Sequence, residues 1–319
     1  MNLLLAGDFS AAERDDWATA LRAALPGHRL CLARGEVPDD TIAVAIVANP
    51  PPGSLAGLPG LRLIQSLWAG VDRLLADASL PSGVPIARMV DPAMNQAMAE
   101  TALWAPLALH RGFFAYGTQQ RAGLWRQLVQ RRADELPVLV LGFGQMGRAV
   151  ARALLRQGYP VAAWRRSASA AGTAIDPALV GVTLHTGTAA LAAALPPAQV
   201  LINLLPLTPD TRGLLDARLL AALPRGAGLV NLARGAHLVD ADLLAALASG
   251  QVGHAVLDVF HAEPLPADHA YWSHPQVTLL PHVAALTDAR SAAAAVARNI
   301  EALARGARLQ HQVERQTGY

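Results

Sequence analysis

Four polar side chains in the second half of the chain each follow an apolar stretch: Arg234, Asp258, Glu263 and His282. A guanidinium holds a carboxylate in a fixed orientation, and an imidazole exchanges a proton near neutral pH. A neighbouring carboxylate favours the charged imidazolium. A single histidine or arginine in such a place is more often structural. Because the carboxyl ends of parallel strands meet at one edge of a sheet, we expect all four to surround one small anionic ligand.

A glycine-rich turn lies earlier in the chain, where Gly142, Gly144 and Gly147 form G-x-G-x-x-G. The buried apolar stretch 138–141 precedes it, and a helical pattern and a second strand, 161–164, follow it. The first glycine permits a tight turn, the second lets a pyrophosphate approach the backbone, and the third lets the helix lie close to the sheet. Free N–H groups at the helix start attract an anion. The pattern predicts a dinucleotide site, against the alternative of a chance glycine turn.

The end of the second strand indicates which dinucleotide is preferred. NAD-specific versions of this turn place an acidic residue there, which bonds the ribose 2′-hydroxyl. This chain has Arg165, Arg166 and Ser167 instead. A planar guanidinium suits a phosphate, so we expect NADP(H) to be preferred, with NAD(H) possible. The alternative is a solvated basic turn.

Two α/β domains must position these residues. We expect two Rossmann-like, doubly wound parallel sheets, the first discontinuous and flavodoxin-like (residues 1–100 plus 286–319), the second dinucleotide-binding (101–285). Ser10 is expected to cap the first helix and Asp240 a later one. A helix over 93–110 should join the domains, and a last helix should run from Thr287 to about Gly306 before the tail returns to the first domain. The expected strands are 2–6, 29–33, 42–48, 61–67, 84–89, 138–141, 161–164, 200–204, 227–232, 254–257 and 277–280.

Composition excludes several classes of function. The 319 residues are 53% hydrophobic and carry a net charge of only +2, with no basic tail for nucleic acid. No stretch approaches a membrane span, and no signal peptide is recognisable. The chain has no lysine, which excludes a lysine Schiff base, and its single cysteine, Cys31, cannot form an internal disulfide. We therefore expect a cytoplasmic protein without a metal site.

Several motifs together resemble the D-isomer-specific 2-hydroxyacid dehydrogenase family over essentially the whole chain. A-G-V-D at 69–72 and M-A-E at 98–100 also fit that family, although Thr101 stands where many relatives carry histidine. The specific motifs are L-G-F-G-Q-M-G at 141–147, L-P-L-T-P-D-T at 205–211, N-L-A-R-G at 231–235, L-D-V-F-H-A-E-P-L at 257–265 and L-L-P-H-V-A-A at 279–285.

The resemblance implies roles at matching positions. Arg234 would bind the substrate's carboxylate and keto oxygen, His282 would be the acid/base, and Glu263 would hydrogen-bond to that histidine. Asp258 would contact the nicotinamide carboxamide. The substrate carboxylate would meet the backbone of Ala69 and Gly70, beside the bulky Trp68. Further cofactor contacts are implied at Gln145, Met146, Trp164, Leu205, Pro206, Thr211, Leu232, Ala233, Arg234, His282 and Ala284.

The implied activity is an NADPH-preferring reduction of small 2-keto acids, with glyoxylate and hydroxypyruvate as leading substrates. The nicotinamide would supply hydride and His282 the proton. Resemblance also implies a homodimer, and the aromatic segment 112–123 is a candidate to contact the partner. The alternatives are a reductase of another 2-keto acid and, more remotely, a dinucleotide-sensing protein without catalysis.

Overall fold

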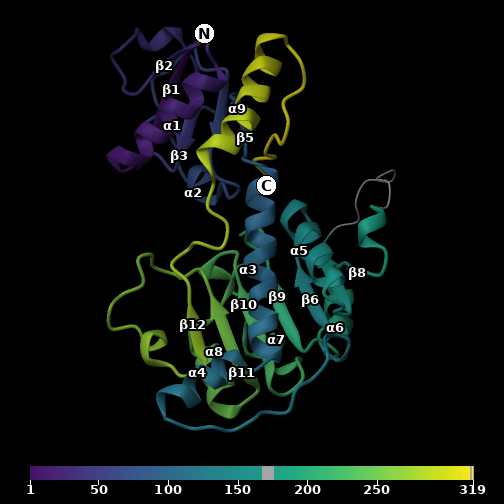
Figure 1. Cartoon of the computed structure of the whole chain (residues 1–319). Coiled ribbons are helices and arrows are strands. Elements are labelled where there is room, and N and C mark those ends of the chain that lie inside the picture. Colours follow the sequence, from purple (N-terminus) through teal and green to yellow (C-terminus); the bar gives the residue numbers. More distant parts are fainter. Residues whose placement is uncertain (167–175, 317, 319) are drawn as a thin grey trace. The chain divides into compact units, whose positions relative to one another are not determined.

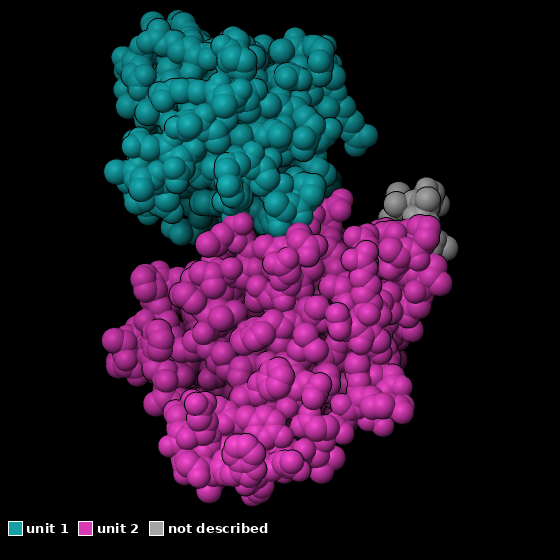
Figure 2. Space-filling view, in the orientation of Figure 1, with its two compact units in different colours: residues 1–94, 287–319 teal, residues 95–286 magenta. Residues whose placement is uncertain are grey.

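The computed structural model describes residues 1–166, 176–316 and 318, so the predicted contact residue Ser167 lies outside the described part. The chain divides into two compact units (Figure 2): Met1–Met94 with Thr287–Tyr319, and Asn95–Leu286. The division falls inside a long helix, α3 (Pro92–His110), rather than at residue 100. None of the helices described is long and apolar enough to cross a bilayer.

The first unit is built on a five-stranded parallel sheet in the order β2-β1-β3-β4-β5 (Figure 1), the flavodoxin-like order. Ser10 caps α1 as predicted, through a capping box with Glu13. The chain's C-terminal part completes this unit, since α9 contacts α1 and Val313 N donates to Ile86 O at 2.7 Å. Its elements are β1 (Asn2–Gly7), α1 (Ala11–Ala24), β2 (Arg29–Cys31), β3 (Ile42–Ala48), β4 (Leu63–Ser66), α2 (Asp72–Leu75), β5 (Ile86–Ala87) and α9 (Ala289–Ala304).

The second unit holds a seven-stranded parallel sheet in the order β12-β11-β10-β9-β6-β7-β8, with α3 beside it (Figure 1). Chain order reverses between β6 and β9, which is where such a sheet binds its ligand. The elements after α3 are α4 (Phe113–Arg121), β6 (Val138–Leu141), α5 (Gln145–Arg156), β7 (Val161–Arg165), β8 (Thr183–Thr186), α6 (Thr188–Ala194), β9 (Val200–Asn203), α7 (Ala217–Ala221), β10 (Ala227–Asn231), α8 (Asp240–Ser249), β11 (Val252–Leu257) and β12 (Val277–Leu279).

Strand β6 shows why an uninterrupted apolar stretch is needed at the centre of this sheet. Successive side chains of a strand point to opposite faces. Val138 and Val140 pack in the cluster that includes residues of α3 and α5, whereas Leu139 and Leu141 pack in the cluster that includes residues of α6, α7 and α8. Both faces of β6 are therefore covered, and the predicted fold of two Rossmann-like parallel sheets is confirmed.

Some predicted local details are wrong. Residues 84–89 form a strand only at Ile86–Ala87, because Arg88 N and Met89 N bond to His311 and Trp68 rather than to β4. Asp240 does not cap α8: it is the first helical residue, and its carboxylate accepts a hydrogen bond from the Tyr271 hydroxyl at 2.9 Å.

The start of the last helix also differs from the prediction. Asp288 caps α9, and the Thr287 hydroxyl bonds to Leu67 O instead.

Candidate active site

The three glycines of the turn have three different environments. Gly142 has φ of 98°, and a Cβ there would lie 2.8 Å from Leu204 O. A Cβ on Gly147 would lie 1.9 Å from Gly142 O, so α5 can approach the turn only without a side chain. A Cβ on Gly144 would meet nothing within 4 Å, and this glycine is the N-cap of α5. The turn thus keeps open space in front of a helix N-terminus, where an anion is favoured.

Two arginines stand at the end of β7. The Nε of Arg165 is buried and, within the described residues, has no hydrogen-bond partner. Arg166 forms an ion pair with Asp210, which lies in the loop after β9. Trp164, the residue before them, is buried, and its indole N–H donates to Gly187 O at 2.9 Å. A buried donor without a partner calls for a ligand or water, so this strand end is a candidate anion site.

The loop after β9, residues 205–211, is tied into a compact turn. The Thr211 hydroxyl donates to Pro206 O at 2.7 Å and accepts from Thr208 N at 2.8 Å. Leu205 N donates to the Asn203 side chain at 3.2 Å. Leu205, Pro206 and Thr211, all predicted cofactor contacts, are therefore held in one rigid turn beside the glycine turn's strand.

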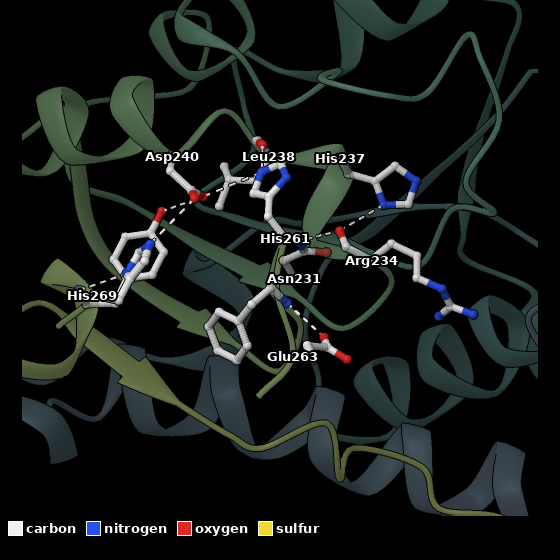
Figure 3. A network of polar contacts seen from close by, with 10 residues as sticks. Asn231, Arg234, His237, Leu238, Asp240, His261, Glu263 and His269 are labelled. Atoms are coloured by element: carbon white, nitrogen blue, oxygen red, sulfur yellow. Dashed lines mark hydrogen bonds and ion pairs between the residues drawn. The ribbon is translucent and has the colours of Figure 1, made fainter. Parts of the chain in front are cut away.

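Arg234 follows β10 in a turn fixed by buried amides. Asn231 Nδ2 donates to Arg234 O at 3.0 Å (Figure 3). Asn231 Oδ1 accepts from Asn203 Nδ2 at 3.0 Å. Arg234 Nη1 donates to Ala233 O at 2.7 Å. A Cβ on Gly235 would lie 2.0 Å from the Phe260 backbone, so glycine lets the turn after β10 pack against the turn after β11.

His237 is a residue that the sequence did not point to. It is fully buried, and its Nδ1 lies 3.2 Å from Arg234 O (Figure 3). Its Nε2 lies 3.3 Å from Pro206 O. The imidazole therefore joins the Arg234 turn to the loop that carries Pro206. The only signal in the sequence is its place two residues after the N-L-A-R-G motif.

His282 and Glu263 form the central pair of the site. His282 Nδ1 lies 2.7 Å from Glu263 Oε2. A carboxylate only accepts, so Nδ1 carries the proton and Nε2 remains to face a substrate. The other carboxylate oxygen, Oε1, accepts from Phe260 N at 2.9 Å. The pair combines a positioned proton donor with the group that holds its orientation.

The pKa values of this pair shift in the directions expected of an ion pair. The Glu263 hydrogen bond raises the pKa of His282, against the opposing effect of burial. Burial alone would raise the pKa of Glu263, but the hydrogen bonds from His282 and Phe260 N outweigh it and lower that pKa. The positive charge of Arg234 acts to lower the pKa of both groups, as a smaller effect than their mutual hydrogen bond.

Asp258 shapes the turn that presents His282. Its buried carboxylate accepts from Val283 N at 2.7 Å and Ala284 N at 3.1 Å, and its carbonyl accepts from His282 N at 2.9 Å. These bonds hold His282 at φ of 56°, a conformation that a non-glycine residue adopts only when its surroundings impose it. Burial raises the pKa of Asp258, although the two N–H donors oppose this. The predicted contact with the nicotinamide stays a prediction.

The remaining predicted substrate residues belong to the first unit. Trp68, Ala69 and Gly70 lie half-buried between β4 and α2. Trp68 N donates to the Ser66 hydroxyl oxygen at 3.0 Å, and Trp68 O accepts from Met89 N at 3.0 Å. Within the second unit, Arg234, Glu263 and His282 follow β10, β11 and β12. In the described part of the chain, no group of three or more His, Cys, Asp or Glu side chains could hold a metal ion.

The chain is similar to proteins of known kind over nearly all of its length. Residues 103–284 match the family model for the NAD binding domain of D-isomer specific 2-hydroxyacid dehydrogenases. The chain is 41% identical over 313 residues to glyoxylate/hydroxypyruvate reductase A of Serratia proteamaculans (strain 568), covering 96% of each chain.

Two solved structures extend the comparison. One is a D-isomer specific 2-hydroxyacid dehydrogenase from Xanthobacter autotrophicus Py2 in complex with NADPH and MES: TM-score 0.92, 38% identity, covering 100% of this chain and 99% of that one. The other is an NADPH-dependent glyoxylate/hydroxypyruvate reductase from Sinorhizobium meliloti in complex with NADP and sulfate: TM-score 0.89, 34% identity, with the same coverage. These matches confirm the predicted resemblance, and the chain belongs to the D-isomer specific 2-hydroxyacid dehydrogenase family.

Proposed function

We propose that this protein is an NADPH-preferring reductase of small 2-keto acids, converting glyoxylate to glycolate and hydroxypyruvate to D-glycerate. The observation that carries the proposal is the 2.7 Å His282–Glu263 pair, which follows the carboxyl ends of strands in the sheet that bears the glycine turn. The similar proteins from Serratia and Sinorhizobium are named as reductases of these two acids, and the latter as NADPH-dependent.

The residues present fit a dinucleotide with a 2′-phosphate. Open space at Gly144, before the N-terminus of α5, suits the pyrophosphate. The buried Nε of Arg165, which has no partner among the residues described, and the guanidinium of Arg166 would supply donors where the ribose phosphate is expected. Gln145 and Met146 begin α5, and the loop with Leu205, Pro206 and Thr211 would border the adenosine. When bound, the nicotinamide supplies the hydride.

The chain's own residues perform the rest of the chemistry. The Arg234 fork would hold the substrate's carboxylate and keto oxygen, with further N–H groups from Ala69 and Gly70. The His282 imidazolium would donate its Nε2 proton to the keto oxygen while Glu263 retains the Nδ1 proton. The Glu263 hydrogen bond raises the pKa of His282 and so favours the charged, proton-donating form. Both cations also stabilise the charge that develops on that oxygen during reduction.

The partner that we propose for this protein is a second copy of the same chain. An apolar surface, defined here as Phe113, Leu124, Trp125 and Val129, lies on α4 and the segment after it, and Trp125 and Val129 are 98% and 92% exposed. A contiguous exposed apolar patch on a protein marks an interaction surface. We propose a homodimer through this surface.

The single buried thiol, Cys31, supports a reducing, cytoplasmic location.

The experiment is a rate measurement over a matched set of cofactors and acids. NADPH and NADH oxidation are each followed with glyoxylate, hydroxypyruvate, pyruvate and a longer 2-keto acid. The proposal predicts the highest kcat/KM for NADPH with glyoxylate or hydroxypyruvate. The highest kcat/KM with a longer 2-keto acid would favour the alternative function, a reductase of a different 2-keto acid. NADPH binding without oxidation on any of the acids would favour a sensing protein.

A further inference from the structure

An ion pair links the two loops that border the glycine turn. Arg166 follows β7, and Asp210 lies in the loop after β9. In the sheet these strands flank β6, the strand that leads into the glycine turn. Neighbouring strands are about 4.8 Å apart, so the pair spans about 10 Å across the end of β6. The Arg166–Asp210 bridge thus crosses the crevice where a dinucleotide of this fold lies.

The two partners differ in how firmly they are held. The Asp210 side chain is 71% exposed, whereas that of Arg166 is 35% exposed. Among the residues that the structure describes, the Asp210 carboxylate contacts Arg166 alone, and the compact turn around Thr211 is held by other groups. Asp210 is therefore an exposed carboxylate whose side chain can turn away from Arg166 without breaking the hydrogen bonds that hold this turn.

We propose that Asp210 is a specificity-determining residue, whose carboxylate competes with the 2′-phosphate of NADP(H) for Arg166. This inference rests on the proposed function, in which Arg166 meets that phosphate. The phosphate carries about two negative charges and takes a guanidinium bidentately, so it displaces the carboxylate. The displaced Asp210 stays nearby as a like charge, and it lowers the affinity for NADPH. NADH has no such phosphate and does not meet this repulsion.

The test changes the charge at position 210 from negative to neutral to positive. The affinity of each variant for NADPH and for NADH is measured by fluorescence titration. Asp210→Asn is expected to tighten NADPH binding about 2- to 5-fold, because an exposed ion pair is weak. Asp210→Arg is expected to tighten it about 10-fold or more, since the charge that meets the phosphate reverses. NADH binding is expected to stay within about twofold in both variants.

The matched control is Asp134, an exposed carboxylate paired with Arg132 at 2.8 Å. Asp134 precedes β6, so it lies toward the amino end of that strand, away from the carboxyl ends where Asp210 lies. Asp134→Asn and Asp134→Arg change the net charge equally and are expected to leave both cofactors unaffected. Weaker NADPH binding in Asp210→Asn would overturn the inference, because Asp210 would then orient Arg166 toward the phosphate. Equal changes for NADPH and NADH would also overturn it.

Arg166→Gln separates this inference from the proposed function. If that variant loses NADPH affinity selectively while the Asp210 series changes nothing, only the role of Asp210 fails. If Arg166→Gln weakens NADPH and NADH alike, the proposed phosphate contact of Arg166 fails, and the inference fails with it.

Discussion

Alanine substitutions at Gly144 and Gly147 should have opposite consequences, although the two glycines are three residues apart. At Gly147 the new Cβ would lie 1.9 Å from Gly142 O, whereas such atoms stay beyond about 3 Å, so α5 or the turn must move by about 1 Å. Overpacking of this kind costs about 1–3 kcal/mol, which lowers the melting temperature by several degrees. Gly147→Ala should therefore be visibly destabilised without any ligand.

Gly144→Ala should fold normally but bind NADPH more weakly. Its Cβ would meet no protein atom within 4 Å, and its φ of −82° is open to alanine. The methyl group would instead occupy the space in front of the N-terminus of α5 and keep the pyrophosphate from the N–H groups. A lost hydrogen bond to a charged group costs about 1.5–3 kcal/mol, or about 10- to 100-fold in Kd.

The assays are thermal unfolding of the apo proteins and fluorescence titration with NADPH. Gly83→Ala is the matched control, since its Cβ would also meet nothing within 4 Å but lies in the first unit. Normal NADPH affinity in Gly144→Ala would refute the reasoning, because the pyrophosphate could then not lie at this turn. An unchanged melting temperature in Gly147→Ala would refute the steric argument.

Four further outcomes follow from the site. Because the Glu263 hydrogen bond raises the pKa of His282, kcat/KM for keto acid reduction should be level at low pH and fall as pH rises through that raised pKa. In Glu263→Gln this pKa should be lower, so the fall should begin at lower pH. A pH–rate profile of both proteins measures the difference. Arg234→Lys keeps the charge but loses the fork, so KM for glyoxylate should rise about 10-fold or more with the NADPH Kd nearly unchanged. Gln at both Arg165 and Arg166 should weaken NADPH at least about 10-fold and NADH less than twofold, by titration. Trp125→Ser should weaken the proposed dimer by about 30-fold or more, measured by sedimentation; an unchanged mass distribution would remove this surface from the interface.

The sequence was informative where one physical requirement dominates. The apolar stretch of β6 had to be buried on both faces, and the glycine turn had to open toward an anion, so both were predictable from local pattern. Strand β8 (T-L-H-T) was missed because its positions are polar and largely exposed at the sheet edge. The short helices α6 and α7 were also missed, since packing rather than periodicity holds them.

Contacts between distant segments were beyond prediction from the sequence. The Arg166–Asp210 ion pair joins residues that are 44 positions apart. The ring nitrogens of His237 contact backbone carbonyls that are 3 and 31 residues away. No side-chain pattern encodes a contact to a carbonyl. The role of Asp258 in holding the 282–284 turn likewise emerges only from the register of β11 against β12.

The most direct measurement is kcat for NADPH oxidation with glyoxylate in the wild-type protein and in His282→Asn. Asparagine tolerates the left-handed backbone at position 282, where φ is 56°, so the turn should persist while the proton donor is lost. We predict measurable wild-type turnover and a loss of about 100-fold or more in the variant. Turnover in His282→Asn within a few fold of wild type would contradict the account.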